Sequence, residues 1–264
     1  MAGLKITILG CGASSGVPAL GNNWGKCDPH EPKNNRTRAS IVVQSENTTL
    51  LVDTGPDLRL QLNREDIQSV TAILYTHAHG DHVAGIDELR SFQRRYKTSI
   101  PIFGNEETVE ELQQRFAYMF HNKFEGFYPK VLEPNIFSGD DYGMPQTIGD
   151  ITFIPFEQDH ATCVSLGYRF GEIGYSTDMI NLEDKAIETL KGIRTWIVDG
   201  AGYFSDTITV HANIARVQAL SEKIGVEQVY LTHLPITMDY QELREGLPEH
   251  FYPCYDGLSF ETNI

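Results

Sequence analysis

Short apolar runs rich in β-branched residues alternate with amphipathic segments along most of the chain. The apolar runs are typical of buried strands, and apolar positions three or four residues apart are typical of helices. We predict strands at Lys5–Gly10, Ala39–Val43, Thr49–Asp53, Val70–Thr76, Ile100–Phe103, Ile151–Phe156, Val164–Phe170, Ile173–Ser176, Thr195–Val198 and Glu227–Thr232. We predict helices at Pro56–Asn63, Gly85–Tyr96, Glu106–Phe116, Leu182–Lys191 and Ala212–Ile224. This order indicates an α/β fold, and because no repeat or linker interrupts it, we predict one domain over residues 1–264.

Five of the apolar runs lead into a histidine or an aspartate. These residues are Asp53, His77, His160, Asp178 and His233. Strand ends deliver side chains into a shared crevice while the sheet holds their geometry. One such strand would mean little, but several predict that distant segments converge on one metal site.

The stretch from Ile73 to His82 ends in three imidazoles and one carboxylate, at His77, His79, Asp81 and His82. These side chains offer enough nitrogen and oxygen donors to hold two divalent metal ions side by side. The alternative of scattered surface histidines does not explain such a density, and a core could not bury so many polar groups without a partner. The stretch therefore predicts a binuclear metallohydrolase.

Composition limits the class of protein. The 264 residues are 41% hydrophobic and 22% charged, as in an ordinary globular protein. No apolar stretch approaches the roughly 20 residues that a membrane helix needs. Since the N-terminus runs directly into the strand-like Lys5–Leu9, we expect no signal peptide and a cytoplasmic location.

The formal net charge of −15, from 36 acidic and 21 basic residues, argues against binding of long nucleic acids. Small phosphorylated substrates remain compatible, because metal ions would supply local positive charge. The guanidinium fork suits a terminal phosphate, and several arginines are candidates for a phosphate clamp. They are Arg36, Arg38, Arg59, Arg90, Arg94 and Arg95.

Four widely spaced cysteines, Cys11, Cys27, Cys163 and Cys254, form no Cys-x-x-Cys pair. This spacing argues against a zinc ribbon and against a disulfide framework. Cys11 could be a nucleophile, but no histidine lies near it in sequence, and a small buried thiol is the favoured interpretation.

The segment Thr76-His77-Ala-His79-Gly-Asp81-His82, followed by His160, Asp178 and His233, resembles the metallo-β-lactamase superfamily. The separations of 83, 18 and 55 residues suit that family. The resemblance implies an αββα sandwich, in which two mixed β-sheets are flanked by helices. Its members include lactamases, lactonases, thioesterases, nucleases and phosphodiesterases, so the motif defines the fold better than the substrate.

Further segments resemble the phosphoribosyl 1,2-cyclic phosphate phosphodiesterase group. They are Gly16–Pro18, Arg36–Ser40, Asp53–Asp57, Gly85–Arg90 and Tyr255–Gly257. This resemblance implies a binuclear phosphodiesterase that opens a small cyclic phosphodiester, such as cyclic phosphoribose or a nucleotide, with a metal-bridging hydroxide. The alternatives are a transfer-RNA 3′-processing nuclease, a thioesterase or lactonase, and a metal-binding relic that senses nucleotides.

The resemblance also implies roles for individual residues. His77, His79 and His160 would hold one metal ion, Asp81, His82 and His233 the second, and Asp178 would bridge them. Histidine and carboxylate ligands fit Zn²⁺, with Mn²⁺ as the alternative. Asp81 also counts among the expected catalytic residues, together with His211.

Two of these polar residues have competing interpretations. His211 would act as a general acid on the leaving oxygen, or would simply begin the helix from residue 212. Asp53 would orient the metal-binding loop, or would be an ordinary turn aspartate at a strand end.

One departure from the phosphodiesterase group concerns an extra structural zinc. That group binds it with a cysteine cluster after Gly-Val-Pro and with a histidine after the last metal histidine. Here only Cys27 remains of the cluster, and the late position is Ile236. We therefore predict no third metal ion.

The segment 115–144 is rich in aromatic residues, among which Phe116, Phe120 and Phe124 share helical spacing. Core packing is the favoured interpretation. A substrate-covering lid and a homodimer interface are the alternatives. Three further histidines, His30, His121 and His250, are not expected to be metal ligands.

Overall fold

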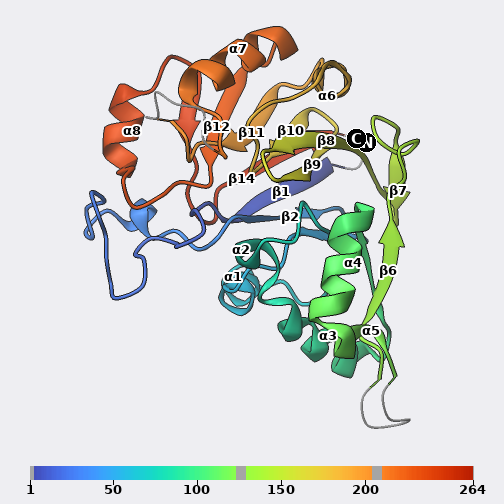
Figure 1. The fold of residues 1–264 in the computed structure, drawn as a ribbon. Helices are drawn as coiled ribbons and strands as arrows, with labels where there is room; N and C mark the ends of the chain where they lie inside the picture. The colour runs from blue at the N-terminus through green and yellow to red at the C-terminus, as the bar shows by residue number, and fades with distance from the viewer. Residues whose placement is uncertain (1–2, 123–128, 204–209, 264) are drawn as a thin grey trace.

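The computed structural model describes residues 3–122, 129–203 and 210–263, in which two seven-stranded sheets face each other (Figure 1). In spatial order, the first sheet contains β14 (Ser259–Asn263), β1 (Gly3–Gly10), β2 (Ser40–Gln44), β3 (Thr49–Val52), β4 (Ala72–Leu74), β5 (Ile100–Gly104) and β6 (Leu132–Ile136). The second contains β13 (Phe251–Pro253), β12 (Gln228–Thr232), β11 (Thr195–Asp199), β10 (Ile173–Ser176), β9 (Cys163–Phe170), β8 (Ile151–His160) and β7 (Gln146–Ile148).

Both sheets are mixed. In the first, strands from β14 to β3 pair antiparallel and strands from β3 to β6 pair parallel. In the second, strands from β7 to β10 pair antiparallel and strands from β10 to β13 pair parallel. The strands β4, β10 and β11 therefore lie in the parallel half of a sheet, where successive strands end at the same edge.

Helices cover the outer faces of both sheets (Figure 1). The first sheet carries α1 (Leu58–Arg64), α2 (Gly80–Val83), the 3₁₀ helix η2 (Ile86–Leu89), α3 (Arg90–Tyr96), α4 (Glu106–Arg115) and α5 (Ala117–Phe120). The second carries α6 (Asp184–Leu190), α7 (Ile214–Ile224) and α8 (Tyr240–Gly246). A further 3₁₀ helix, η1, spans Pro32–Asn34 in the segment between β1 and β2.

The apolar side chains divide into a central layer and two outer layers. The central cluster fills the space between the sheets and contains Ile6, Val52, Phe153 and Tyr168. The outer clusters pack each sheet against its helices. The fold prediction of two mixed β-sheets flanked by helices is thus confirmed. The prediction of a single domain stays a prediction.

All ten predicted strands are present, with ends that shift by a few residues. The four strands that were not predicted, β6, β7, β13 and β14, are the outermost strands of the two sheets. Edge strands are short and carry polar residues, so their apolar pattern is weak. The predicted helix Gly85–Tyr96 is divided into η2 and α3. Within the described ranges, no helix is long and apolar enough to cross a membrane.

Candidate metal centre

Strand ends from both sheets deliver polar side chains to one place. His77 follows β4, His160 is the last residue of β8, and Asp178 and His233 follow β10 and β12. Asp178 and His233 have positive φ angles of 48° and 57°, and Asp53, after β3, has 64°. Such backbone conformations are costly for residues other than glycine and cluster at functional sites. The chain thus turns sharply at three strand ends that carry polar residues.

The turn after β3 packs tightly against the loop that carries the histidines. A Cβ atom on Gly55 would lie 2.4 Å from the carbonyl oxygen of Asp81. Only glycine allows this close approach. The Asp53–Asp57 segment is therefore a support for the histidine loop.

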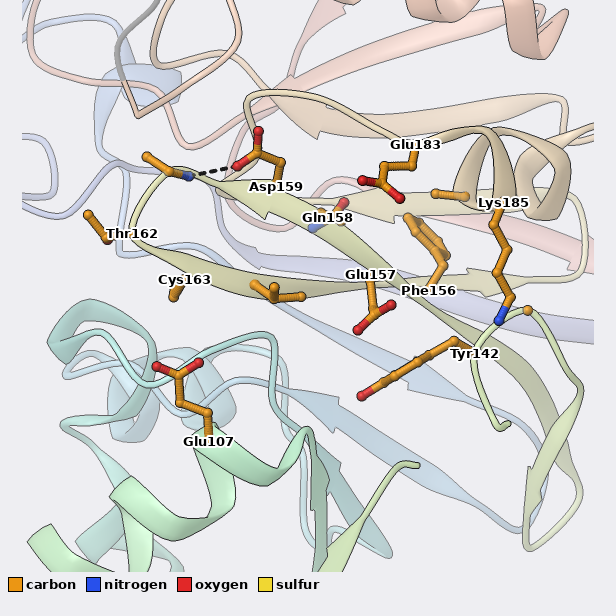
Figure 2. Close-up of a pocket in the computed structure, with 14 residues that line it drawn as sticks. Glu107, Tyr142, Phe156, Glu157, Gln158, Asp159, Thr162, Cys163, Glu183 and Lys185 are labelled. Carbon is orange, nitrogen blue, oxygen red and sulfur yellow. Dashed lines mark hydrogen bonds between the residues drawn. The ribbon is translucent and has the colours of Figure 1, made fainter. Parts of the chain in front are cut away.

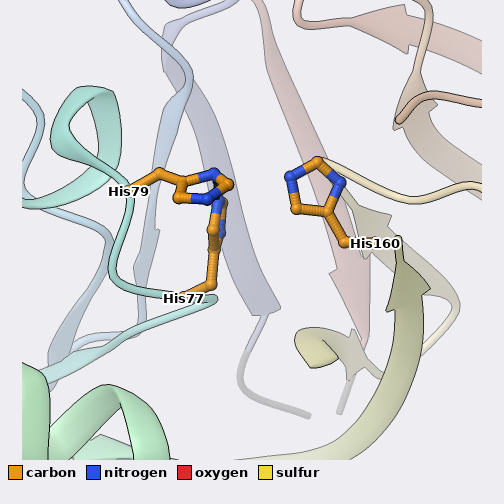
Figure 3. Close-up of side chains that lie close together, drawn as sticks. All are labelled: His77, His79 and His160. Carbon is orange, nitrogen blue, oxygen red and sulfur yellow. Dashed lines mark hydrogen bonds between the residues drawn. The ribbon is translucent and has the colours of Figure 1, made fainter. Parts of the chain in front are cut away.

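Three imidazoles, those of His77, His79 and His160, point toward one another (Figure 3). His77 Nε2 and His79 Nδ1 lie 2.9 Å apart, and the His77 and His160 ring centroids lie 5.1 Å apart. One nitrogen of each ring lies within 4.8 Å of the others. The geometry suits three nitrogen ligands of one ion.

A second group contains Asp81, His82 and His233, again with ligand atoms within 4.8 Å of one another. Asp178 lies between the two groups. Its Oδ2 is 2.9 Å from His82 Nε2 and 3.4 Å from His233 Nε2, and its Oδ1 is 3.6 Å from His160 Nε2. All seven predicted ligands are therefore brought together, and their roles as metal ligands stay a prediction.

The electrostatics of the site fit bound cations. Burial lowers the pKa of His82, but the carboxylates of Asp178 and Asp53 outweigh burial and hold it well above its ordinary value. Among the described residues, the buried His82 Nε2 and His233 Nδ1 have no hydrogen-bond partner of good geometry. Burial and the neighbouring His82 hold the pKa of His77 well below its usual range. A divalent metal ion would neutralise the excess negative charge of these carboxylates. It would also bind the imidazole nitrogens that lack hydrogen bonds.

Hydrogen bonds on the far sides of the rings fix several imidazoles. Asp53 accepts from His82 Nδ1 at 2.7 Å and from the amide and hydroxyl of Thr76 at 2.8 Å. Thr76 Oγ1 contacts His77 Nδ1 at 3.0 Å, and His160 Nδ1 lies 2.9 Å from the carbonyl oxygen of Val210. Such contacts orient metal-ligating histidines. The orienting interpretation of Asp53 thus has direct geometric support.

His211 lies at the edge of the site, with its Nδ1 donating to Asp199 Oδ2 at 2.6 Å. Burial lowers the pKa of His211, but its hydrogen bond to Asp199 and the charges of Asp199 and Asp178 outweigh burial and raise the pKa to about 9. Helix α7 begins at Ile214 with Asn213 as its N-cap, so the interpretation that His211 starts this helix is wrong.

Sequence reasoning missed Asp199. It ends β11 after the apolar residues Trp196, Ile197 and Val198, the same pattern that drew attention to the other strand ends. Asp199 is fully buried and also accepts from the amides of Met179 and Ala201. These hydrogen bonds hold its carboxylate toward His211.

The other candidate residues are not members of the two groups of ligands. His30, His121 and His250 are exposed and belong to neither group. Among the arginines, Arg38 pairs with Asp57 and Arg90 with Asp87. Arg59 and Arg95 line a hollow between α1 and α3, and Arg94 is exposed on α3.

Arg36 is a correction, because its guanidinium is buried and cannot clamp a substrate phosphate. It donates to Met238 O at 2.7 Å and to Asn34 Oδ1 at 3.1 Å. Cys27 Sγ lies 3.9 Å from Arg36 Nη1 and 3.4 Å from Met238 O. Cys27, the one remaining residue of the family's zinc cluster, thus belongs to an arginine-centred hydrogen-bond network. The absence of a third metal stays a prediction.

A cavity of about 530 Å³ lies beside the β8–β9 hairpin (Figure 2). Its lining includes Glu107, Tyr142, Glu157, Cys163 and Lys185. None of the seven predicted ligands lines it, although Cys163 pairs with His160 across the hairpin. The cavity is therefore a neighbour of the metal centre rather than the centre itself.

The cysteines and aromatic residues have mainly structural surroundings. Cys11 is buried, as predicted, and burial together with Asp256 holds its thiol pKa well above the usual value. Phe116 and Phe120 pack in the outer core of the first sheet, as expected. Their helical continuity is broken between α4 and α5. Phe124 lies outside the described residues.

Comparisons with known proteins agree with this geometry. A family model described as "Beta-lactamase superfamily domain" matches residues 48–234. The chain is 24% identical to the probable metallo-hydrolase YhfI of Bacillus subtilis, over 92% of this chain and 91% of that protein. It is 30% identical to an octanoyltransferase of Porphyromonas gingivalis, over 97% of this chain and 51% of that protein. The chain thus spans about half the length of the octanoyltransferase.

A crystal structure described as a new diphosphatase from the PhnP family superposes with a TM-score of 0.85 and 30% sequence identity. The match covers 99% of this chain and 98% of that one. The prediction of a metal-dependent hydrolase is confirmed by these relatives. The chain belongs to the metallo-β-lactamase superfamily.

Proposed function

We propose that the protein is a binuclear metal-dependent phosphodiesterase that hydrolyses a small cyclic phosphodiester, such as cyclic phosphoribose or a cyclic nucleotide. Its two ions would be held by His77, His79 and His160 and by Asp81, His82 and His233, with Asp178 between them. The histidine-rich set favours Zn²⁺ over Mn²⁺. We further propose that the protein works in the cytoplasm and that its oligomeric state is a homodimer.

The observation that carries this proposal is the arrangement of His211 and Asp199 beside two adjacent groups of ligands. Asp178 lies within 3.8 Å of atoms from both groups and of His211 Nδ1. A hydrolase that breaks a P–O bond to an alkoxide needs both an activated water and an acid for the leaving oxygen. The site offers residues suited to both tasks.

The chemistry divides among these groups. When bound, two divalent ions would supply an activated water and neutralise charge on the phosphoryl oxygens. Asp199 accepts a hydrogen bond from His211 Nδ1, which stays protonated. The Nε2 proton of the imidazolium can therefore pass to the leaving oxygen. Asp53 and Thr76 hold the histidine loop while this happens.

A diphosphatase is the second candidate, because the PhnP-family diphosphatase matches nearly the whole chain. Hydrolysis of a phosphoanhydride needs the same water and the same charge neutralisation. It needs less help from His211, because a phosphate leaves more readily than an alkoxide. The chain matches only about half of the octanoyltransferase, so we do not infer its activity for this protein. The similarity is the reason to include an octanoyl thioester among the test substrates.

One metal-loaded preparation tests the proposal against a panel of substrates. The panel contains ribosyl 1,2-cyclic phosphate, 2′,3′- and 3′,5′-cyclic nucleotides, a dinucleoside diphosphate, a precursor transfer RNA and an octanoyl thioester. We expect kcat/KM to be largest for a cyclic phosphodiester, and His77→Ala to abolish turnover. Preference for the diphosphate would favour the second candidate, whereas preference for RNA or the thioester would overturn the proposal.

A further inference from the structure

His79 differs from the other imidazoles of its group in how it is held. His77 Nδ1 contacts Thr76 Oγ1, and His160 Nδ1 contacts a backbone carbonyl oxygen. His79 is exposed, and among the described residues the one hydrogen-bond contact of its imidazole is through Nδ1 to His77. Its ring therefore lacks the side-chain support that usually orients a metal-binding histidine.

The peptide that precedes His79 is held from outside the loop by Arg115. Arg115 Nη1 donates to the carbonyl oxygen of Ala78, the residue between His77 and His79. The same nitrogen donates to Glu111 Oε1 at 2.9 Å, one turn earlier on α4. Glu111 thus aims the guanidinium at the loop.

Helix α4 is a firm base for this contact. Its N-cap, Asn105, accepts from the amide of Thr108 and donates to the carbonyl oxygen of Val164 on β9. Val109 and Leu112 are both buried, and Leu112 belongs to the outer core cluster of the first sheet. Arg115 occupies the last turn, where a cation interacts favourably with the helix dipole. In Figure 1, α4 lies on the flank of the first sheet that also carries α2.

We propose that Arg115 is a positioning residue for the metal centre: by holding the Ala78 peptide, it keeps the His79 imidazole in the group formed with His77 and His160. This inference rests on the proposed function. The Arg115 and Glu111 side chains are 36% and 46% exposed, so their ion pair contributes little to folding. Loss of Arg115 should therefore weaken metal binding more than it weakens the fold.

The test is titration of the full-length, metal-free chain with Zn²⁺ in competition with a chromophoric chelator, together with thermal unfolding without metal. We expect Arg115→Met to weaken one of two Zn²⁺ sites about tenfold and to leave the other nearly unchanged. The melting temperature should stay within about 2 °C of the wild type, because the pair is exposed. Arg115→Lys, which retains a donor for Ala78, should lose less affinity.

Matched variants separate positioning from a general effect. Arg244→Met removes another exposed arginine from a last helical turn, on α8, and should change neither Zn²⁺ site. Glu111→Gln leaves the Arg115 donor in place and should cost little. In a His79→Ala background, Arg115→Met should have no further effect, because it acts through His79.

The outcomes are distinct. Unchanged Zn²⁺ affinities in Arg115→Met and Arg115→Lys would overturn this inference but not the proposed function. The same holds if Arg115→Met lowers the affinity of both Zn²⁺ sites equally, or if it lowers the affinity as much in the His79→Ala background as in the wild type. A wild-type chain that does not bind two Zn²⁺ ions would overturn the proposed function itself. Should Arg115→Met fail to fold, Arg115→Lys and its combination with His79→Ala decide the question.

Discussion

At the scale of single residues, the His211–Asp199 pair differs from the other histidine contacts of the site. Its hydrogen bond is 2.6 Å long, and the carboxylate side is fully buried while His211 is partly open. Since the pKa of His211 is raised to about 9 without bound metal ions, the imidazolium is the neutral-pH form of the metal-free protein. The stability from this pair is fully present below the unfolded histidine pKa of about 6.5 and is lost as the pH rises through about 9.

Replacing His211 tests its role as a general acid. We expect His211→Gln to lower kcat about 100-fold on a cyclic phosphodiester with an alkoxide leaving group. The loss should be much smaller on bis-p-nitrophenyl phosphate, because p-nitrophenolate leaves without a proton. Steady-state kinetics on both substrates, with metal content measured on the same samples, check this result. Equal losses on the two substrates would contradict an acid role.

Asp199 gives the pH dependence. As His211 must be protonated to donate, kcat should fall on the alkaline side. The fall should occur below about pH 9, because bound cations would lower the pKa of His211 from its raised value of about 9. Asp199→Asn removes the charge that raises this pKa and should move the alkaline limb about one to two pH units lower. A pH profile of kcat checks this shift. An alkaline limb at the same pH in both proteins would show that another group is titrating.

At the scale of elements, strand ends and helix caps position the functional side chains. The functional side chains end or follow β4, β8, β10, β11 and β12, all of which have apolar sequences that indicate strands. The unpredicted strands are edge strands, and none of them carries a predicted ligand. The apolar pattern is strong in β4 and β10, which are buried along their whole length and lead into the site.

The cap of α7 provides a prediction about an element. Asn213 Oδ1 accepts from the amide of Arg216, and Asn213 caps α7, which starts at Ile214. We expect Asn213→Ala to lower the free energy of unfolding by about 1 kcal/mol. Asn105→Ala should cost more, because Asn105 caps α4 and also donates to Val164 O. Urea denaturation of the two variants and the wild type measures both values, and the reverse order would refute this account of the caps.

At the scale of the whole molecule, the metal centre joins the two sheets. His77, His79, Asp81 and His82 follow a strand of the first sheet, whereas His160, Asp178 and His233 end or follow strands of the second. Bound ions would therefore connect the two halves of the sandwich across the edge of the central core. Because the ions would bind only the folded arrangement, their binding adds to stability.

Metal removal tests this connection. At a free metal concentration 100 times Kd, binding adds about 2.7 kcal/mol per ion. For a chain of this size, two ions together correspond to a melting temperature about 10 to 20 °C higher. We expect a chelator to lower the melting temperature by this amount, and to have a smaller effect on Asp178→Asn. An unchanged melting temperature after verified metal removal would contradict the connection.

Much of the site was accessible from the sequence because its residues are locally encoded. The His77–His82 stretch contains four side chains that can bind metal within six residues, and the later predicted ligands lie at the ends of apolar runs. Asp199 was missed because a single aspartate after a strand resembles any strand-terminal residue. Arg36 was wrongly included because a charge near a family motif says nothing about its burial.

The sequence alone determined the α/β fold and the strands of the sheet interiors, because hydrophobic period is a local property of the chain. The seven predicted ligands came from its resemblance to a known family. Only the tertiary structure decided which histidines contact the Asp178 carboxylate. It also decided that Arg36 is buried and that Arg115 holds the Ala78 peptide. These relations join residues such as Ala78 and Arg115, or Asp81 and His233, that are far apart in sequence. Their distances depend on how two sheets and their helices pack, which no local pattern specifies.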